Sequence, residues 1–186
     1  MRKVYPSFLI DPGHGGKDPG ACGIEAKINL DISLCLRNLI SELGLLCELT
    51  RHEDIYVSLQ ERVRLANMMK PSCLISIHCN AFDSPYAEGL EVWTSTRIDH
   101  SDTLATSILL SLGLTFPYNK KRYDYSDGDL DKETDTFYIL RESKVPTVLL
   151  ELGFLSNPKE LAWLSNPANH RYISSAIATG ALAWSY

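Results

Sequence analysis

Four residues far apart in the sequence, two histidines and two glutamates, are of types that could do chemistry together. His14 follows a short apolar run, residues 5–10, and opens a stretch crowded with glycine and proline. This pattern predicts a buried strand ending in a loop whose glycines let the backbone approach a ligand closely. Glu25, His78 and Glu151 supply partners, and two histidines with one carboxylate form a common catalytic zinc set that leaves a fourth position for water.

Six segments are predicted to be strands, with helical patterns between them: residues 5–10, 45–50, 73–78, 90–93, 137–140 and 147–151. This alternation implies an α/β fold, a single domain with a mostly parallel twisted sheet of about six strands and helices on both faces. In such folds ligands gather at the carboxyl ends of strands. His14, His78 and Glu151 each follow or end a strand, and Glu25 opens the first helix. We therefore expect the four residues to converge on one crevice.

Capping residues predict where several helices begin. Ser58 and Glu61 form a capping box, Asp102 opens a third helix, and Asn157 and Asn166 each precede a proline at the first helical position. The first helix is indicated by apolar residues spaced three to four apart, with a glycine as stop signal: Ile32, Leu36, Leu39, Leu43 and Gly44. The last helix is expected to bury Ile173, Ile177, Gly180, Ala181 and Trp184.

Several short motifs occur in a fixed order over nearly the whole chain, from about Leu9 to the C-terminus. They are IDPGHGG (10–16), Glu25 with NL (29–30), TRHED (50–54), SLQER (58–62), AN (66–67), SIHCNA (76–81), GLEV (89–92) and ELGFLSN (151–157). In this order the chain resembles the zinc-dependent N-acetylmuramoyl-L-alanine amidases, type 3 catalytic domain, which cleave bacterial cell wall. One departure is visible, because Ala26 stands where the family often has lysine, and Lys27 follows.

The resemblance implies a role for each candidate residue. His14, Glu25 and His78 match the family's zinc ligands, and Glu151 matches its catalytic glutamate. The implied activity is hydrolysis of the amide between N-acetylmuramic acid and L-alanine in peptidoglycan, with Zn²⁺ as cofactor. Zinc would polarise the carbonyl, and Glu151 would move a proton from water to the leaving amine.

Other interpretations of individual residues remain open. Glu151, at the end of an apolar strand, could instead form a structural ion pair with Arg51 or Arg141. Asn80 shares a face with His78 if the strand continues, so it could bind substrate or support a metal ligand.

Further polar residues have structural interpretations. Arg51, Asp54 and Arg62 are best read as a buried ion-pair network that shapes the fold. His52, His100 and His170 are expected to be solvated. Residues 127–131 alternate like a calcium loop but lack its glycine and its final glutamate, so residues 123–135 are expected to form a mobile acidic loop.

The five cysteines cannot all pair within one chain. Cys35, Cys47 and Cys73 lie in apolar runs and are expected to be small core residues. Cys22 and Cys79 lie near the candidate ligands, but no Cys-x-x-Cys pair supports thiolate ligation. A protein built on disulfides is not expected.

Composition limits the partners. The chain has 186 residues, 45% of them hydrophobic, and a net charge of −5, which gives no support to nucleic-acid binding. No apolar run approaches the ~20 residues that span a bilayer, and the N-terminus does not read as a secretory signal. We expect one catalytic domain, 1–186, without a separate cell-wall-binding domain. It would be made in the cytoplasm and reach the wall as a phage lysin (the favoured reading), a delivered toxin or a domain trimmed from a longer protein.

Two rival functions remain open from the sequence, and the connection after residues 90–93 bears on regulation. The rivals are a zinc carboxypeptidase or endopeptidase acting on wall peptides, and a catalytically inactive wall-binding module.

Some relatives carry a long helix that covers the zinc, inserted after the strand matching residues 90–93. Here only residues 94–102 stand at that place, which predicts an open enzyme that needs no activator protein.

Overall fold

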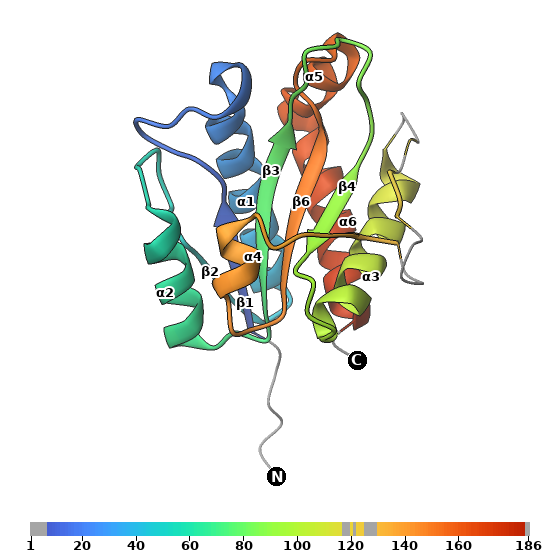
Figure 1. Ribbon diagram of the computed structural model, residues 1–186. Coiled ribbons are helices and arrows are strands. Elements are labelled where there is room, and N and C mark those ends of the chain that lie inside the picture. The colour runs from blue at the N-terminus through green and yellow to red at the C-terminus, as the bar shows by residue number, and fades with distance from the viewer. Residues whose placement is uncertain (1–6, 117–119, 121, 125–129, 185–186) are drawn as a thin grey trace.

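A six-stranded sheet in the order β2-β1-β3-β6-β4-β5 organises the protein (Figure 1). The computed structural model describes residues 7–116, 120, 122–124 and 130–184. The strands are β1 (Ser7–Pro12), β2 (Leu46–Leu49), β3 (Cys73–Asn80), β4 (Glu91–Thr94), β5 (Lys132–Glu133) and β6 (Thr147–Phe154). Strands β2, β1, β3 and β6 pair in parallel. Strand β4 pairs antiparallel with β6, and β5 pairs in parallel with β4 at the edge of the sheet. The predicted α/β class with a mostly parallel sheet is confirmed.

Helices cover both faces of the sheet. They are α1 (Glu25–Glu42), α2 (Leu59–Met69), α3 (His100–Thr115), α4 (Tyr138–Glu142), α5 (Pro158–Leu164) and α6 (Pro167–Trp184). Helices α1 and α3 both pack against α6 on one face of the sheet. Figure 1 shows α2 and α4 on the near side of the sheet and α1 and α6 behind it.

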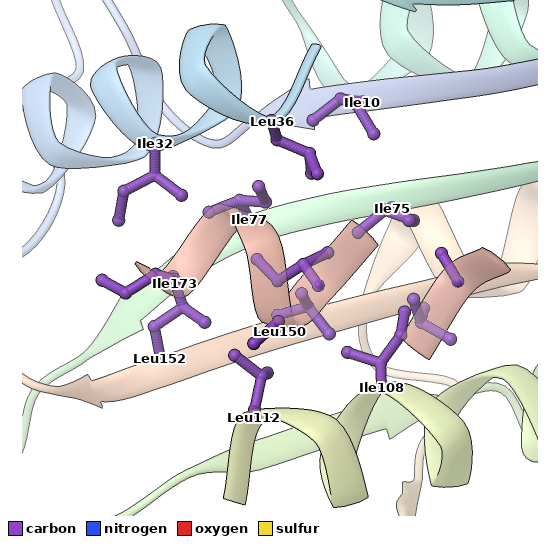
Figure 2. Close-up of a cluster of buried hydrophobic side chains, with 14 of the residues drawn as sticks. Ile10, Ile32, Leu36, Ile75, Ile77, Ile108, Leu112, Leu150, Leu152 and Ile173 are labelled. Carbon is purple, nitrogen blue, oxygen red and sulfur yellow. The ribbon is translucent and has the colours of Figure 1, made fainter. Parts of the chain in front are cut away.

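The larger core lies between the sheet and helices α1, α3 and α6 (Figure 2). Alternate strand residues such as Ile75, Ile77 and Leu150 point into it, while Leu74 and Leu149 point to the opposite face, beneath α2 and α4. Apolar side chains on both faces explain why the central strands read as continuous hydrophobic runs. Burying each such side chain stabilises the fold by about 1.5–3 kcal/mol.

Two predictions about local structure are wrong. Residues 137–140 were expected to be a strand, but Phe137 precedes helix α4, which buries Ile139 and Leu140 against the near face of the sheet. A four-residue apolar run cannot distinguish a strand from a short buried helix by periodicity. Part of the expected acidic loop is also ordered, because Lys132–Glu133 forms edge strand β5. Residues 125–129 of that loop lie outside the described residues.

The predicted helix starts are largely confirmed. Ser58 Oγ accepts a hydrogen bond from Glu61 N at 3.2 Å, and the side chain of Asn157 caps α5. Helix α3 begins earlier than expected, with Asp99 as its N-cap and Asp102 completing a capping box. The connection from β4 to α3, residues 95–99, contains no helix, which agrees with the expected short connection. Across the described part of the chain, no helix combines the length and apolarity that a membrane crossing requires.

Candidate metal centre and active site

The four candidate residues meet where the parallel strands end, as the sequence predicts. Strand β1 ends at Pro12 and leads through Gly13 to His14, and His78 lies near the end of β3. Glu25 is the first residue of α1, and Glu151 lies on β6 with its backbone paired to that of His78. All four line one cavity of about 540 Å³ between the sheet, the segment before α2 and helix α4.

The carboxylate of Asp18 orients the imidazole of His14 by contacting the ring nitrogen that faces away from Glu25. Its Nδ1 lies 2.9 Å from Asp18 Oδ2, and its Nε2 lies 3.1 Å from Glu25 Oε2. A proton on Nδ1 directed at Asp18 leaves the lone pair of Nε2 facing Glu25, which is the arrangement that metal-bound histidines commonly show. Sequence reasoning missed Asp18, although its position four residues after His14 in a turn-rich loop was a signal for it.

The carboxylate of Glu25 is buried at the N-terminal end of α1 and is held by several donors. Ala21 N donates to Oε2 at 2.8 Å, and Cys79 N and Asn29 Nδ2 each donate to Oε1 at 3.1 Å. The helix N-terminus also favours a negative charge there. These donors fix the carboxylate so that both oxygens remain close to the two histidines.

The three side chains form a compact donor set. His78 Nδ1 lies 3.1 Å from Glu25 Oε1, and one ligand atom from each of His14, Glu25 and His78 lies within 4.8 Å of the others. The hydrogen bond to Glu25 raises the pKa of His14 to about 9. Burial opposes ionisation of Glu25, but its hydrogen bonds with both histidines lower its pKa well below the usual range. The cluster therefore favours a positive charge, a proton or a cation, at its centre.

Gly13 makes room for the ring of His78. A Cβ atom at this position would lie 2.2 Å from His78 Cε1 and 2.5 Å from His78 Nδ1. Any side chain would therefore push the ring away from Glu25. The close approach of backbone predicted from the glycine-rich motif is present, and it serves the second histidine as well as the first.

Glu151 is a half-buried acid with one fully buried carboxyl oxygen. Its Oε2 has no hydrogen-bond partner among the described residues. Burial and repulsion from Glu25 and Glu91 raise its pKa to about 8. The alternative ion pairs find no support, because Arg51 donates to backbone carbonyls and Arg141 pairs with Glu142 at 2.9 Å. A strongly shifted, unpartnered carboxyl in a cavity is typical of a catalytic group.

Asn80 lines the same cavity but already makes local contacts. Its Nδ2 donates to Glu91 Oε2 at 3.2 Å, and its Oδ1 accepts from Ala81 N at 2.8 Å. Glu91 is buried and also binds Arg122 at 2.5 Å and Lys132 at 3.2 Å. A register shift lies between His78 and Asn80, so the two do not simply share a strand face. Contact of Asn80 with substrate remains a prediction.

The expected ion-pair network is correct only in part. Arg62 forms a buried ion pair at 2.6 Å, but its partner is Asp11, which sequence reasoning did not identify. Arg51 is buried and donates to carbonyl oxygens, and Asp54 accepts a hydrogen bond from Gly16 N at 2.8 Å near the surface. Among the described residues, Asp11 is thus the only carboxylate that hydrogen-bonds to either arginine, through Arg62, and their other hydrogen bonds go to backbone carbonyls.

One histidine prediction is wrong. His52 and His100 are exposed as expected, but His170 is buried, with its Nε2 2.9 Å from Leu164 O. The residue follows Asn166 and Pro167 at the start of α6, where the preceding helix end supplies the carbonyl. A buried position in the first turn of a helix was not visible from composition alone.

The cysteines behave largely as expected, and all five are free thiols. Cys47 and Cys73 are buried, and Cys35 is half-buried. The sulfur of Cys79 lies 3.6 Å from Asn29 Oδ1, and Cys22 is exposed. Burial raises the pKa of the Cys79 thiol well above its usual value, which disfavours the thiolate that a metal would need.

The fold is α/β with a mostly parallel sheet, and a His–Glu–His cluster that could hold a metal ion lies at the carboxyl ends of its parallel strands. The chain matches the family described as N-acetylmuramoyl-L-alanine amidase over residues 8–183 and belongs to that family. It is 32% identical to the N-acetylmuramoyl-L-alanine amidase LytC of Bacillus subtilis, over 97% of this chain and 36% of the relative. It is 31% identical to the probable cell wall amidase LytH of Staphylococcus epidermidis, over 94% of this chain and 56% of the relative.

Solved structures of similar proteins share the whole fold. The N-acetylmuramoyl-L-alanine amidase of Clostridium difficile 630 superposes with a TM-score of 0.88 at 30% identity, covering 97% of this chain and 96% of the other. AmiC2 of Nostoc punctiforme gives 0.86 at 30% identity and covers 96% of both chains. The chain thus spans about a third to a little over half the length of these two curated relatives and nearly all of these two structures.

Proposed function

We propose that this protein is a zinc-dependent N-acetylmuramoyl-L-alanine amidase. It would hydrolyse the amide between the lactyl group of N-acetylmuramic acid and the L-alanine of the stem peptide in peptidoglycan. Family membership supports the reaction class. The observation that carries the proposal is the placement of the unpartnered Glu151 carboxyl in one cavity with the clustered donors of His14, Glu25 and His78.

The donor set fits zinc. Two imidazole nitrogens and one carboxylate are ligands that Zn²⁺ prefers, and three protein ligands are typical of a catalytic site. Glu25 lies 3.1 Å from each histidine, through Oε2 to His14 and through Oε1 to His78, and each pair of atoms is close enough to share one ion with bonds of about 2.0–2.2 Å. When bound, zinc would supply Lewis-acid catalysis by polarising the scissile carbonyl.

Glu151 is proposed as the proton carrier. Its carboxylate would accept a proton as the oxygen of water bonds to the scissile carbon, and would deliver that proton to the nitrogen as the C–N bond breaks. The products are a lactyl carboxylic acid on the glycan and a free amino group on L-alanine. Because burial and neighbouring carboxylates raise its pKa to about 8, the group can hold a proton near neutral pH.

The surrounding residues would keep this arrangement rigid. Asp18 fixes the tautomer of His14, and Asn29 and the Cys79 amide hold Glu25. Asn80 is proposed as a substrate contact at the cavity wall, through an amide that already binds Glu91.

Product analysis tests the function against its rivals. Purified peptidoglycan is digested with the protein, and the soluble products are identified by mass spectrometry. Complete stem peptides with a free L-alanine amino group, together with intact glycan, are expected. Shortened stem peptides would instead indicate a peptidase, and wall binding without release would indicate an inactive binding module. Glu151→Gln serves as the matched control, because it preserves the shape of the side chain.

We further propose that the enzyme acts on the cell wall without an activator protein. The short, non-helical connection of residues 95–99 supports this proposal, because it leaves no room there for a covering helix. Turnover of purified wall by the isolated protein is the test. A silent protein that becomes active when residues 123–135 are shortened would show instead that this segment is inhibitory.

A further inference from the structure

We propose that Arg51 and Arg62 are positioning residues that set the affinity of the metal centre by clamping the backbone around His14. Neither residue belongs to the donor set. The inference rests on the proposed zinc site and adds to it a requirement on two buried guanidinium groups.

Arg62 holds the carbonyl of the first ligand itself. Its NH2 donates to His14 O at 2.7 Å and its NH1 to Pro12 O at 2.7 Å. The same NH1 binds Asp11 Oδ1 at 2.6 Å. Asp11 is in turn fixed by hydroxyl groups, with Ser76 Oγ donating to Oδ2 at 2.7 Å. The guanidinium therefore lies on a rigid support inside the sheet edge and not on a mobile loop.

Arg51 joins the segments that carry two different ligands. Its Nε donates to Pro12 O and its NH2 to Gly13 O, both at 2.9 Å, just before His14. The same NH2 donates to Ala26 O at 2.7 Å, in the first turn of α1 and next to Glu25. One side chain thus fixes the distance between the loop of the first ligand and the helix of the second.

The backbone of His14 needs such support. His14 has a φ of 60°, in the left-handed region that costs a residue with a side chain about 1–2 kcal/mol. At the neighbouring Gly15, where φ is 127°, a Cβ atom would lie 2.9 Å from Arg51 Nε and 2.3 Å from Ile55 O. Strain held against a donor cluster is typical of a preorganised site.

A purely structural role explains this arrangement less well. Within the described residues, Asp11 is the one buried carboxylate that pairs with Arg62, and Arg51 hydrogen-bonds only to carbonyl oxygens, so carbonyls offset most of the desolvation of these two guanidinium groups. Most of those carbonyls belong to Pro12, Gly13 and His14 and to the residue after Glu25. The other two belong to Glu53 and Val57, in the segment before α2. The two buried guanidinium groups therefore lie where the segments that carry His14 and Glu25 must be held together.

The test measures zinc affinity in Arg51→Lys and Arg62→Lys. Lysine keeps the charge but lacks the planar fork that binds several carbonyls at once. The control is Arg97→Lys, since Arg97 also donates to two carbonyls, Leu140 O at 3.1 Å and Ser143 O at 2.9 Å, outside the donor set. Zinc dissociation constants come from competition with a chromophoric chelator, and folding is checked by circular dichroism. The absorption spectrum of bound Co²⁺ reports the ligand geometry.

Loss of a group that orients metal ligands typically weakens affinity about 10- to 100-fold, and we expect this for both site variants, with a changed Co²⁺ spectrum. The control should stay within about two-fold of the wild type. Folded site variants with wild-type affinity and spectrum would overturn the proposal. So would site variants that remain unfolded at saturating zinc, because the arginines would then be needed for the fold itself. A wild type that binds no zinc would overturn the proposed metal site as well.

Discussion

Replacing Glu151 by glutamine is expected to remove a pH-dependent destabilisation of the metal-free protein. Burial and the nearby carboxylates of Glu25 and Glu91 raise the pKa of Glu151 from its ordinary value of 4.5 to about 8. In the unfolded chain the group ionises near 4.5, whereas in the folded protein it keeps its proton until about pH 8. The folded state therefore binds more protons between these values, and stability must fall as pH rises through this window.

The size of the effect follows from the same shift. One pKa unit is worth about 1.4 kcal/mol, so the full difference between 4.5 and about 8 amounts to about 5 kcal/mol. Most of it falls between pH 5 and pH 7.5, where this one carboxyl should lower the free energy of unfolding by about 3 kcal/mol. Glutamine has nearly the same shape and does not titrate, so the variant should lack this loss.

Urea denaturation of the metal-free protein at pH 5 and pH 7.5 measures the effect. The quantity of interest is the stability of Glu151→Gln minus that of the wild type, which should rise by about 3 kcal/mol from the lower to the higher pH. Contributions of titrating groups that do not interact with Glu151 cancel in this difference. Glu48→Gln, at an exposed position on β2, is the control and should show no such rise. An equal difference at both pH values would refute the assignment of a protonated Glu151 in the folded protein.

Three further outcomes are expected. The protein should bind one zinc ion per chain, a chelator should abolish activity and zinc should restore it; full activity in protein shown to be metal-free would contradict the mechanism. In a direct zinc assay, Glu151→Gln should retain the metal while its turnover falls by roughly 10²–10⁴-fold. His78→Ala should lose both the metal and the activity. Loss of zinc from Glu151→Gln would show that Glu151 is a ligand. Gly13→Ala should lose zinc affinity, because its Cβ would lie 2.2 Å from the ring of His78; unchanged affinity would show that the ring can move aside without cost.

Much of the fold and site could be predicted because the signals are local and strong. The apolar runs that became β1, β3 and β6 are each bounded by polar or turn-forming residues, so the strands were visible. Parallel strands place their carboxyl ends together, and this rule predicts from sequence alone that His14, His78 and Glu151 lie at one edge of the sheet. The positions of His14, Glu25 and His78 could be predicted because they lie at or near the ends of elements, whereas β6 continues past Glu151 to Phe154, three residues beyond the expected end of that strand.

The missed features depend on contacts that only the folded chain defines. Residues 137–140 are as apolar as a strand, and they form α4 because the near face of the sheet needs cover there. Strand β5 holds two charged residues, and it exists only through pairing with β4. The partner of Arg62 is Asp11, 51 residues away, which neither periodicity nor motif spacing could indicate.

The three donor side chains come from a loop after β1, from the start of α1 and from β3, so the tertiary fold assembles the proposed metal site. His14 and His78 are joined only when β1 and β3 pair, so the unfolded chain presents scattered ligands with no common geometry. The proposed zinc ion would therefore bind the native state far more tightly than the unfolded chain, and its binding free energy would add to the stability of the fold. At a free zinc concentration of about 1,000 times the dissociation constant, it would add about 4 kcal/mol.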